Sequence, residues 1–199
     1  AATGPAEALL VMGMPATQLP IDGAWLTFPA PATQDTVEVF DPVLRGSAPA
    51  EFAGEEEIAG RTVYRYSQHI APTNVAMRYA DPRNTLTLED DNGEPQRTFL
   101  HHAADREILV DQETGVVVGI DEKVDDFYAD AEGRGVQNVV TYDGVMDRQD
   151  VEKLVQKVGD AQTAAADRGL WRVLAWVGAA LTLAGLAGAL RPGRAARRD

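Results

Sequence analysis

The sequence contains no cysteine, so disulfide bonds, zinc–thiolate sites and thiol chemistry are all excluded. It also lacks the common enzyme signatures: there is no GxSxG, no phosphate-binding loop and no dinucleotide-binding fingerprint. Basic residues are few, because 18 lysines and arginines stand against 31 aspartates and glutamates in 199 residues. A surface this acidic repels nucleic acid, so we expect no nucleic-acid partner.

Histidine is also scarce, and its three occurrences are His69, His101 and His102. Adjacent residues of a β-strand point to opposite faces, so His101 and His102 are poorly placed to bind one metal ion. A zinc site would need carboxylates from elsewhere in the chain, and the sequence has no HExxH spacing. We therefore predict neither a metal site nor a bound cofactor.

One long apolar run lies at residues 170–190, where Val173 to Leu190 carry no charge. A helix of this length would be about 30 Å long, enough to cross the hydrocarbon core of a bilayer. Four arginines follow within residues 191–199. Because basic residues favour the cytoplasmic side, we predict a transmembrane helix over 170–190, a cytoplasmic tail over 191–199 and an extracytoplasmic location for the preceding residues.

Small residues recur within this predicted span at Ala180, Ala184 and Gly188. Small side chains at a spacing of four let two membrane helices approach closely. We interpret them as a helix-packing face for a membrane-protein partner. The alternative is an alanine-rich anchor that contacts lipid alone.

Residues 36–146 show the pattern of an antiparallel β domain, with short β-forming runs separated by turn residues. Asn92-Gly93 and Gly115 suit the tight turns of two hairpins, and Ala59-Gly60 suits a third. The predicted strands are 36–40, 55–58, 61–70, 84–90, 95–102, 106–110 and 116–124. The remaining predictions are a loop at 45–53, a loop or sheet edge at 125–142, and an irregular segment at 1–35 with a candidate first strand at 23–28.

A helix is predicted to follow the β domain, because Asp147 is a suitable N-cap residue. Apolar residues then recur at helical spacing, at Val151, Leu154, Val155 and Val158. We assign residues 147–169 to a stalk helix whose apolar stripe packs on the sheet or, alternatively, on a partner. The predicted fold class is mainly β, an antiparallel sheet of hairpins with a C-terminal stalk helix and one transmembrane helix.

Two groups of residues are candidates for ligand contacts. If the sheet is curved, strand alternation predicts a concave face that shelters an acyl chain at Tyr64, Tyr66, Phe99 and Val117. A second group, Asp121, Asp125 and Asp126, has the residue type needed to bind a cation or to form the carboxylate pair of a glycosidase. A solvated strand edge is the alternative for this acidic series.

Four features follow one another in the chain: the strand 60–66 after an acidic hairpin arm, the turn 111–115, the strand end 122–126, and a C-terminal span with a basic tail. In this order they resemble the PorA family of actinobacterial membrane proteins. The resemblance implies a membrane helix at each end, an extracytoplasmic β-rich domain between them, and a role in the maturation or export of envelope glycolipids and lipoglycans. Because the first helix is missing, we expect an N-terminally truncated fragment.

These observations favour a non-enzymatic protein of the cytoplasmic membrane. Its extracytoplasmic domain is predicted to bind a lipid, glycan or protein partner in cell-envelope assembly or export. The expected partners are the lipid bilayer, an envelope lipid or lipoglycan, and other membrane proteins. Two alternatives stay open: an accessory subunit of a larger membrane complex that docks through the stalk and the span, and an envelope hydrolase.

Overall fold

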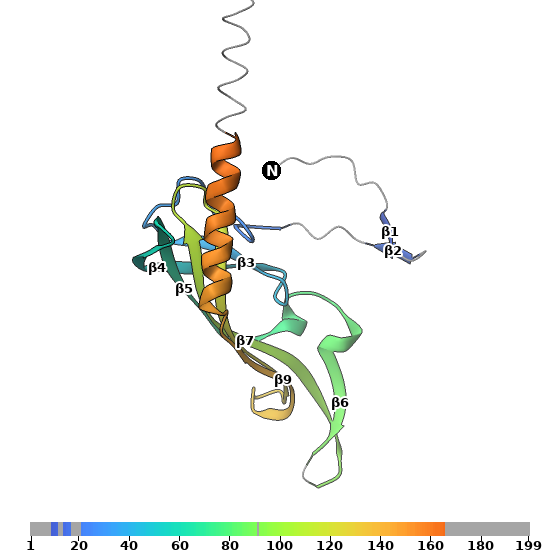
Figure 1. Ribbon diagram of the computed structural model, residues 1–199. Helices are drawn as coiled ribbons and strands as arrows, with labels where there is room; N and C mark the ends of the chain where they lie inside the picture. Colours follow the sequence, from blue (N-terminus) through green and yellow to red (C-terminus); the bar gives the residue numbers. More distant parts are fainter. Residues whose placement is uncertain (1–8, 12–13, 17–20, 91, 166–199) are drawn as a thin grey trace, which may run out of the picture. The chain divides into compact units, whose positions relative to one another are not determined.

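The computed structural model describes residues 9–11, 14–16, 21–90 and 92–165, which are drawn in colour in Figure 1. The chain divides into two compact units, residues 1–155 and residues 156–199. The first unit contains an antiparallel β-sheet and the beginning of a helix at 148–165. The described part of the second unit, residues 156–165, continues in helical conformation.

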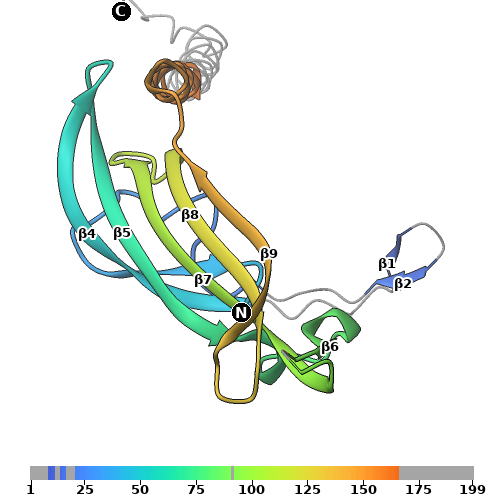
Figure 2. The same ribbon diagram turned by 90° about the horizontal axis from the view of Figure 1, so that it is seen from below.

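The main sheet has seven strands, and every pairing in it is antiparallel. Its order is β3-β4-β5-β7-β8-β9, and β6 pairs with one end of β7. The strands are β3 (Val37–Asp41), β4 (Gly46–Ile58), β5 (Arg61–Asn74), β6 (Thr85–Glu89), β7 (Pro95–Asp111), β8 (Val117–Ala129) and β9 (Gly135–Gly144). Figure 2 shows the long strands β4, β5, β7 and β8 side by side with a common curvature. The mainly β, antiparallel prediction is therefore confirmed.

Four short elements lie outside this order of strands. The segments β1 (Leu9–Val11) and β2 (Met14–Ala16) form a separate two-stranded antiparallel sheet. Two single-turn 3₁₀ helices, η1 (Val75–Met77) and η2 (Pro82–Asn84), connect β5 to β6. The predicted strand at 23–28 is wrong, because this segment forms only two isolated bridges, Ala24 with Val39 and Thr27 with Val116.

The predicted hairpin turns are confirmed. Ala59 and Gly60 both have positive φ, 50° and 78°, as a two-residue turn between twisted strands requires. Gly115 has a φ of 69°, and a Cβ atom there would lie only 2.4 Å from the carbonyl oxygen of Phe28. Glycine is therefore required at 115 both by its own backbone and by the segment that crosses it.

Several strands are longer than predicted. β4 begins at Gly46, so residues 46–53 are not a loop. The strands predicted at 95–102 and 106–110 are one continuous strand, β7. Within 125–142, β8 runs on to Ala129 and β9 forms a sheet edge. Charged residues on the solvent face of these strands lower their apparent β propensity, while tertiary pairing keeps them extended.

The largest core cluster lies where an N-terminal segment, residues 21–36, crosses one face of the sheet. Its buried members are Phe28, Ala32, Val39, Ala50, Tyr66, Ile108 and Val110. Phe28 and Tyr66 pack with their ring centroids 4.8 Å apart. The segment is fixed by backbone bonds, since Phe28 N donates to Gly115 O and Ala32 N donates to Gln112 O, each at 2.7 Å. A second cluster, Leu44, Ile70, Val75 and Ala104, lies further along the sheet.

The helix at 148–165 begins as predicted. Asp147 caps it, because its carboxylate accepts a hydrogen bond from Gln149 N at 2.7 Å. Within the first unit the helix packs on the sheet: Val151 and Val155 are buried, and a Cβ atom at Gly119 would lie 3.0 Å from the Val151 side chain. A salt bridge from Arg148 to Glu56, at 2.8 Å, adds a polar contact.

The remaining C-terminal predictions fall outside the described residues. They are the end of the stalk at 166–169, the span 170–190 with Ala180, Ala184 and Gly188, and the tail 191–199. Among the residues that are described, no helix has both the length and the apolar character needed to cross a membrane.

Candidate functional site

An apolar groove of about 250 Å³ opens beside β3, β7 and β8. Apolar side chains dominate its lining, and one ion pair stands among them. The lining residues are Trp25, Leu26, Val39, Phe40, Pro42, Arg106, Ile108, Val117, Ile120 and Glu122. These residues come from distant parts of the sequence, so only the tertiary structure assembles the groove.

The rim of the groove is apolar yet open to solvent. Trp25, Leu26 and Ile120 are 47 %, 66 % and 41 % exposed, whereas Phe40 and Ile108 are buried beneath them. The Trp25 ring meets the Phe40 ring edge-on, with centroids 5.9 Å apart. Exposed large apolar side chains grouped around a hollow are typical of a binding surface.

Backbone hydrogen bonds hold this rim in place. On the β3 side, Ala24 N donates to Glu38 O and Phe40 N donates to Ala24 O, each at 2.7 Å. On the β8 side, Val117 N donates to Leu26 O at 3.1 Å. The groove is therefore preformed by fixed backbone, which lowers the entropy that a ligand must overcome on binding.

An ionic network lies against one side of the groove, and we define it as the buried residues Asp41, Gln68, His102 and Arg106 with the partly buried Glu122 and Asp126. Arg106 is its centre: its guanidinium donates to the Asp41 carboxylate at 2.8 Å, to Gln68 Oε1 at 2.9 Å and to the Glu122 carboxylate. Asp41 also accepts from Leu44 N at 2.6 Å. Every charge in this interior region is thus paired and hydrogen-bonded, as burial requires.

His102 joins two carboxylates inside the ionic network. Its side chain is fully buried, with Nδ1 2.6 Å from Asp126 Oδ1 and Nε2 3.2 Å from Asp41 Oδ2. Burial alone lowers the pKa of His102, but hydrogen bonds and charges from Asp126 and Asp41 outweigh it and raise the pKa to about 9. The imidazole is therefore charged at neutral pH and donates from both nitrogens.

The same contacts act on Asp41. Burial raises the pKa of this carboxyl, but the hydrogen bond from His102, the Leu44 amide and the Arg106 guanidinium together bring it down to about 2. In the part of the chain that the structure describes, both hydrogen-bond partners of the His102 ring are carboxylates, so neither ring nitrogen lies against a hydroxyl that it could activate. The contacts of the ionic network fix the orientation of the Arg106 guanidinium.

The predicted ligand residues are only partly brought together. Val117 lines the apolar groove. Tyr66 is fully buried in the main core cluster, where its hydroxyl donates to the carbonyl of Thr33, and Tyr64 packs against the same cluster. Phe99 lies elsewhere on β7, opposite Ala129 of β8. Tyr64, Tyr66 and Val117 therefore lie in or against the main core cluster, and of these Val117 also lines the groove.

The predicted acidic residues serve separate contacts. Asp121 accepts from Met146 N at 2.9 Å, and Asp125 accepts from Thr141 Oγ1 at 3.1 Å. Asp126 belongs to the ionic network. In the part of the chain that the structure describes, no three His, Asp or Glu side chains gather to hold a metal ion.

His101 and His102 contact different partners, in agreement with their predicted opposite orientations. The His101 ring stacks on Phe127 with centroids 5.5 Å apart, and its Nδ1 lies 3.1 Å from Phe99 O. His102 meets the two carboxylates of the ionic network instead. The pair therefore offers no shared ligand position.

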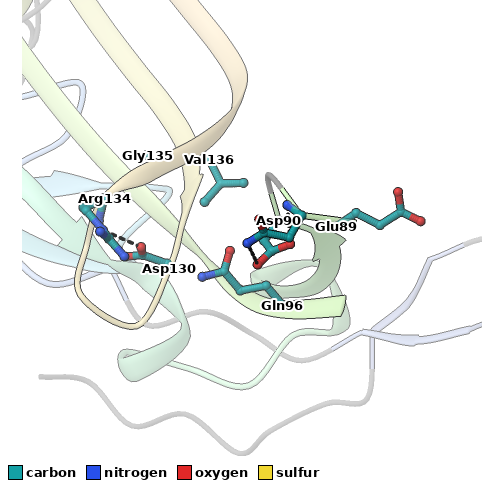
Figure 3. A pocket seen from close by; sticks show the side chains of 8 residues that line it. Glu89, Asp90, Gln96, Asp130, Arg134, Gly135 and Val136 are labelled. Atoms are coloured by element: carbon teal, nitrogen blue, oxygen red, sulfur yellow. Dashed lines mark hydrogen bonds and ion pairs between the residues drawn. The ribbon is translucent and has the colours of Figure 1, made fainter. Parts of the chain in front are cut away.

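A second, polar cleft of about 390 Å³ lies between the turns that follow β6 and β8. Figure 3 shows it between the Asp130–Arg134 pair and the side chains of Asp90 and Gln96. Asp90 accepts from Asn92 N and Glu94 N, and Asp130 accepts from Arg134 N, all within 2.9 Å. These carboxylates stabilise their own turns, so the apolar groove is the better candidate site.

Sequence reasoning missed most of the site. The sequence patterns do not mark Trp25, Leu26 and Ile120 as members of one site, and they give no role to Asp41, which directly follows the strand predicted at 36–40. One feature of the sequence indicates the ionic network: Arg106 is spaced by two from Ile108 and by four from Val110, so it lies on the same face of the strand as these apolar residues. An arginine on the buried face of a strand requires buried carboxylate partners, so this parity predicts an ionic network.

Comparison with known proteins supports the resemblance stated above. The family described as porin PorA matches the chain over residues 6–187. None of the curated proteins matches it.

Proposed function

The chain belongs to the porin PorA family, and on that premise we propose that its β domain binds the acyl part of an envelope lipid or lipoglycan without catalysing a reaction. Family membership implies association with a cell-envelope membrane. Within that setting we propose the orientation that the sequence predicts, with the β domain outside the cytoplasmic membrane and residues 191–199 inside. The protein would then act in the assembly or export of envelope glycolipids.

The observation that carries this proposal is the apolar groove with its solvent-exposed rim of Trp25, Leu26 and Ile120. Burying such side chains against a hydrocarbon chain is favourable by about 25 cal/mol for each Å² removed from water. The groove volume, about 250 Å³, is below the roughly 300–1,000 Å³ of sites that enclose whole small molecules. It fits one end of a single acyl chain, while the rest of the lipid stays outside.

The charges around the groove favour a neutral headgroup. Arg106 is the cation of the lining, but its guanidinium is already bonded to Asp41, Gln68 and Glu122, so it offers no free charge to a phosphate. The net charge of the whole chain is −13, which disfavours an anionic lipid. A glycosylated or zwitterionic lipid needs no free cation from the protein and is not repelled by its negative charge.

Photolabelling of the intact chain tests this proposal. The 199-residue chain is reconstituted in phosphatidylcholine vesicles that contain a photoactivatable fatty acid, and the labelled peptides are mapped by mass spectrometry. Labels are expected on the peptides that contain Trp25–Leu26 and Ile120. Ile120→Asp should reduce the labelling several-fold, whereas Leu86→Asp, at a site of similar exposure on β6, should leave it unchanged. Equal labelling of the two variants would contradict the proposal.

Native purification in mild detergent gives an independent measurement. A lipid or lipoglycan that remains bound in stoichiometric amount, and is lost from Ile120→Asp, supports binding in the groove. Co-purification of membrane proteins with no lipid in the β domain favours the accessory-subunit alternative. The hydrolase alternative has less support, because Asp121, Asp125 and Asp126 make separate contacts.

A further inference from the structure

β9 is an open edge of the main sheet, and its side chains are unusually apolar for such a position. No other strand of the described residues pairs with its outer side. Val136, Val139, Val140 and Tyr142 are each between 40 % and 47 % exposed. A strand edge with unpaired backbone groups and exposed apolar side chains is a template for pairing with another strand.

The opposite edge of the sheet, at β3, is covered by another part of the chain. There the N-terminal segment covers β3, since Ala24 bridges to Val39 and exchanges backbone hydrogen bonds with Glu38 and Phe40. Among the described residues no segment covers β9 in this way, and residues 135–142 contain neither a charged residue nor a proline, the usual protections of an edge strand. Register shifts distort its first half, so the regular part of the edge is Val140–Gly144.

We propose that β9 pairs antiparallel with β9 of a second copy of this chain, so that two sheets join into one across a two-fold axis. Such an axis, perpendicular to the sheet, places one residue opposite its own copy and satisfies both free edges at once. If the axis lies anywhere from Val140 to Tyr142, Asp143 lies opposite a residue between Gln137 and Thr141 of the second copy. None of the residues from 137 to 141 is charged. The strand therefore pairs with itself without a like-charge contact, despite the acidic chain.

The packing behind β9 supports the same pairing. Val140 lies opposite Asp126 and Tyr142 opposite Val124 in the register with β8. Asp126 reaches the ionic network, and Val124 packs against the second core cluster. Val140 and Tyr142 thus extend the covered face of the sheet beyond its last neighbour, and a second copy of β9 would bury them.

Cysteine cross-linking tests the pairing directly, because the native chain has no cysteine. Single cysteines are placed at Val140, Thr141 and Tyr142 of the 199-residue chain in detergent, and each variant is mildly oxidised. Opposed residues of an antiparallel pair lie about 4.5–5.5 Å apart between Cα atoms, within the range of a disulfide. We expect disulfide-linked dimers with the highest yield at one of the three positions. Ser67→Cys, exposed on β5, is the matched control and should remain monomeric.

Sedimentation of a second variant gives an independent readout. Val140→Lys places like charges near the axis and should raise the dimer dissociation constant about tenfold or more, whereas Leu86→Lys should not change it. Val140 does not line the groove, so Val140→Lys should leave the lipid labelling unchanged. A failure of strand pairing can therefore be distinguished from a failure of lipid binding. Cross-linking at β9 no faster than at Ser67→Cys, or sedimentation as a monomer at all concentrations, would overturn it, as would cross-linking to a different protein only.

Discussion

Raising the pH through the titration of His102 should destabilise the β domain. The pKa of this imidazole is raised from 6.5 to about 9 because burial, which lowers it, is outweighed by Asp126 and Asp41. A group with a raised pKa stabilises the folded state fully below its unfolded pKa, and that contribution is lost as the pH rises through the folded pKa. The contribution of His102 to the free energy of unfolding should therefore be level up to about pH 6.5 and fall between pH 6.5 and 9.

The size of this fall follows from the shift. One pKa unit corresponds to about 1.4 kcal/mol, so His102 should contribute about 3 kcal/mol that is absent above pH 9. Asp41, whose pKa is lowered to about 2, does not titrate in this window. Arg106 also keeps its charge, because the pKa of its guanidinium is raised above an already high value. Neither of these two partners therefore contributes to the fall, and the comparison with His102→Gln assigns it to the imidazole.

Urea unfolding followed by tryptophan fluorescence is the assay. The chain has three tryptophans, so changing Trp171 and Trp176 to Phe leaves Trp25 as a single reporter in the β domain. His102→Gln in the same background should remove the fall between pH 6.5 and 9. It should also lower the free energy of unfolding at pH 6.5 by about 3–5 kcal/mol, because Asp41 and Asp126 lose their buried partner.

Two results would refute the reasoning about His102. One is a free energy of unfolding that stays level or rises from pH 6.5 to 9, which would mean that burial outweighs the two carboxylates. The other is an unchanged pH dependence in His102→Gln, which would assign the titration to another group. If His102→Gln does not fold, the imidazole chemical shifts of the unchanged protein give its pKa directly.

Three further predictions concern single local contacts. Gly115→Ala should lower the free energy of unfolding by about 3 kcal/mol, because alanine disfavours the positive φ at this position and its Cβ would clash with the Phe28 carbonyl. Gly60→Ala has the same unfavourable φ but open space around its Cβ, so it should lower the free energy of unfolding by only about 1–2 kcal/mol; equal losses for the two variants would contradict the clash. Phe28→Ala should cost about 3–5 kcal/mol in urea unfolding, and a smaller loss would mean that the crossing segment is not part of the core. Asp147→Ala should cost about 1 kcal/mol and increase amide exchange in the first helical turn; unchanged exchange would exclude the capping bond.

Hairpin turns and the helix start could be predicted from the sequence, because each depends on a few neighbouring residues. Ala59-Gly60 and Gly115 mark turns through their allowed backbone conformations, and Asp147 marks a helix start through one side chain. The family resemblance was also within reach, since it depends on the order of such local features, and the match over 6–187 confirms it. The boundaries of the strands could not be predicted from the sequence, because the exposed face of a strand has the same residue composition as a loop.

The sequence by itself thus determined a mainly β, antiparallel chain with its turns, its helix start and its family. The tertiary structure alone decided which residues meet: His102 reaches Asp41 across 61 positions, and Leu26 meets Val117 across the sheet. It also decided that Ala24 bridges to β3 at one edge of the sheet, while no described strand pairs with the outer side of β9 at the other. The physical reason is that turns and caps arise from local backbone geometry, whereas the groove, the ionic network and the edges depend on strand register and on how the N-terminal segment crosses the sheet.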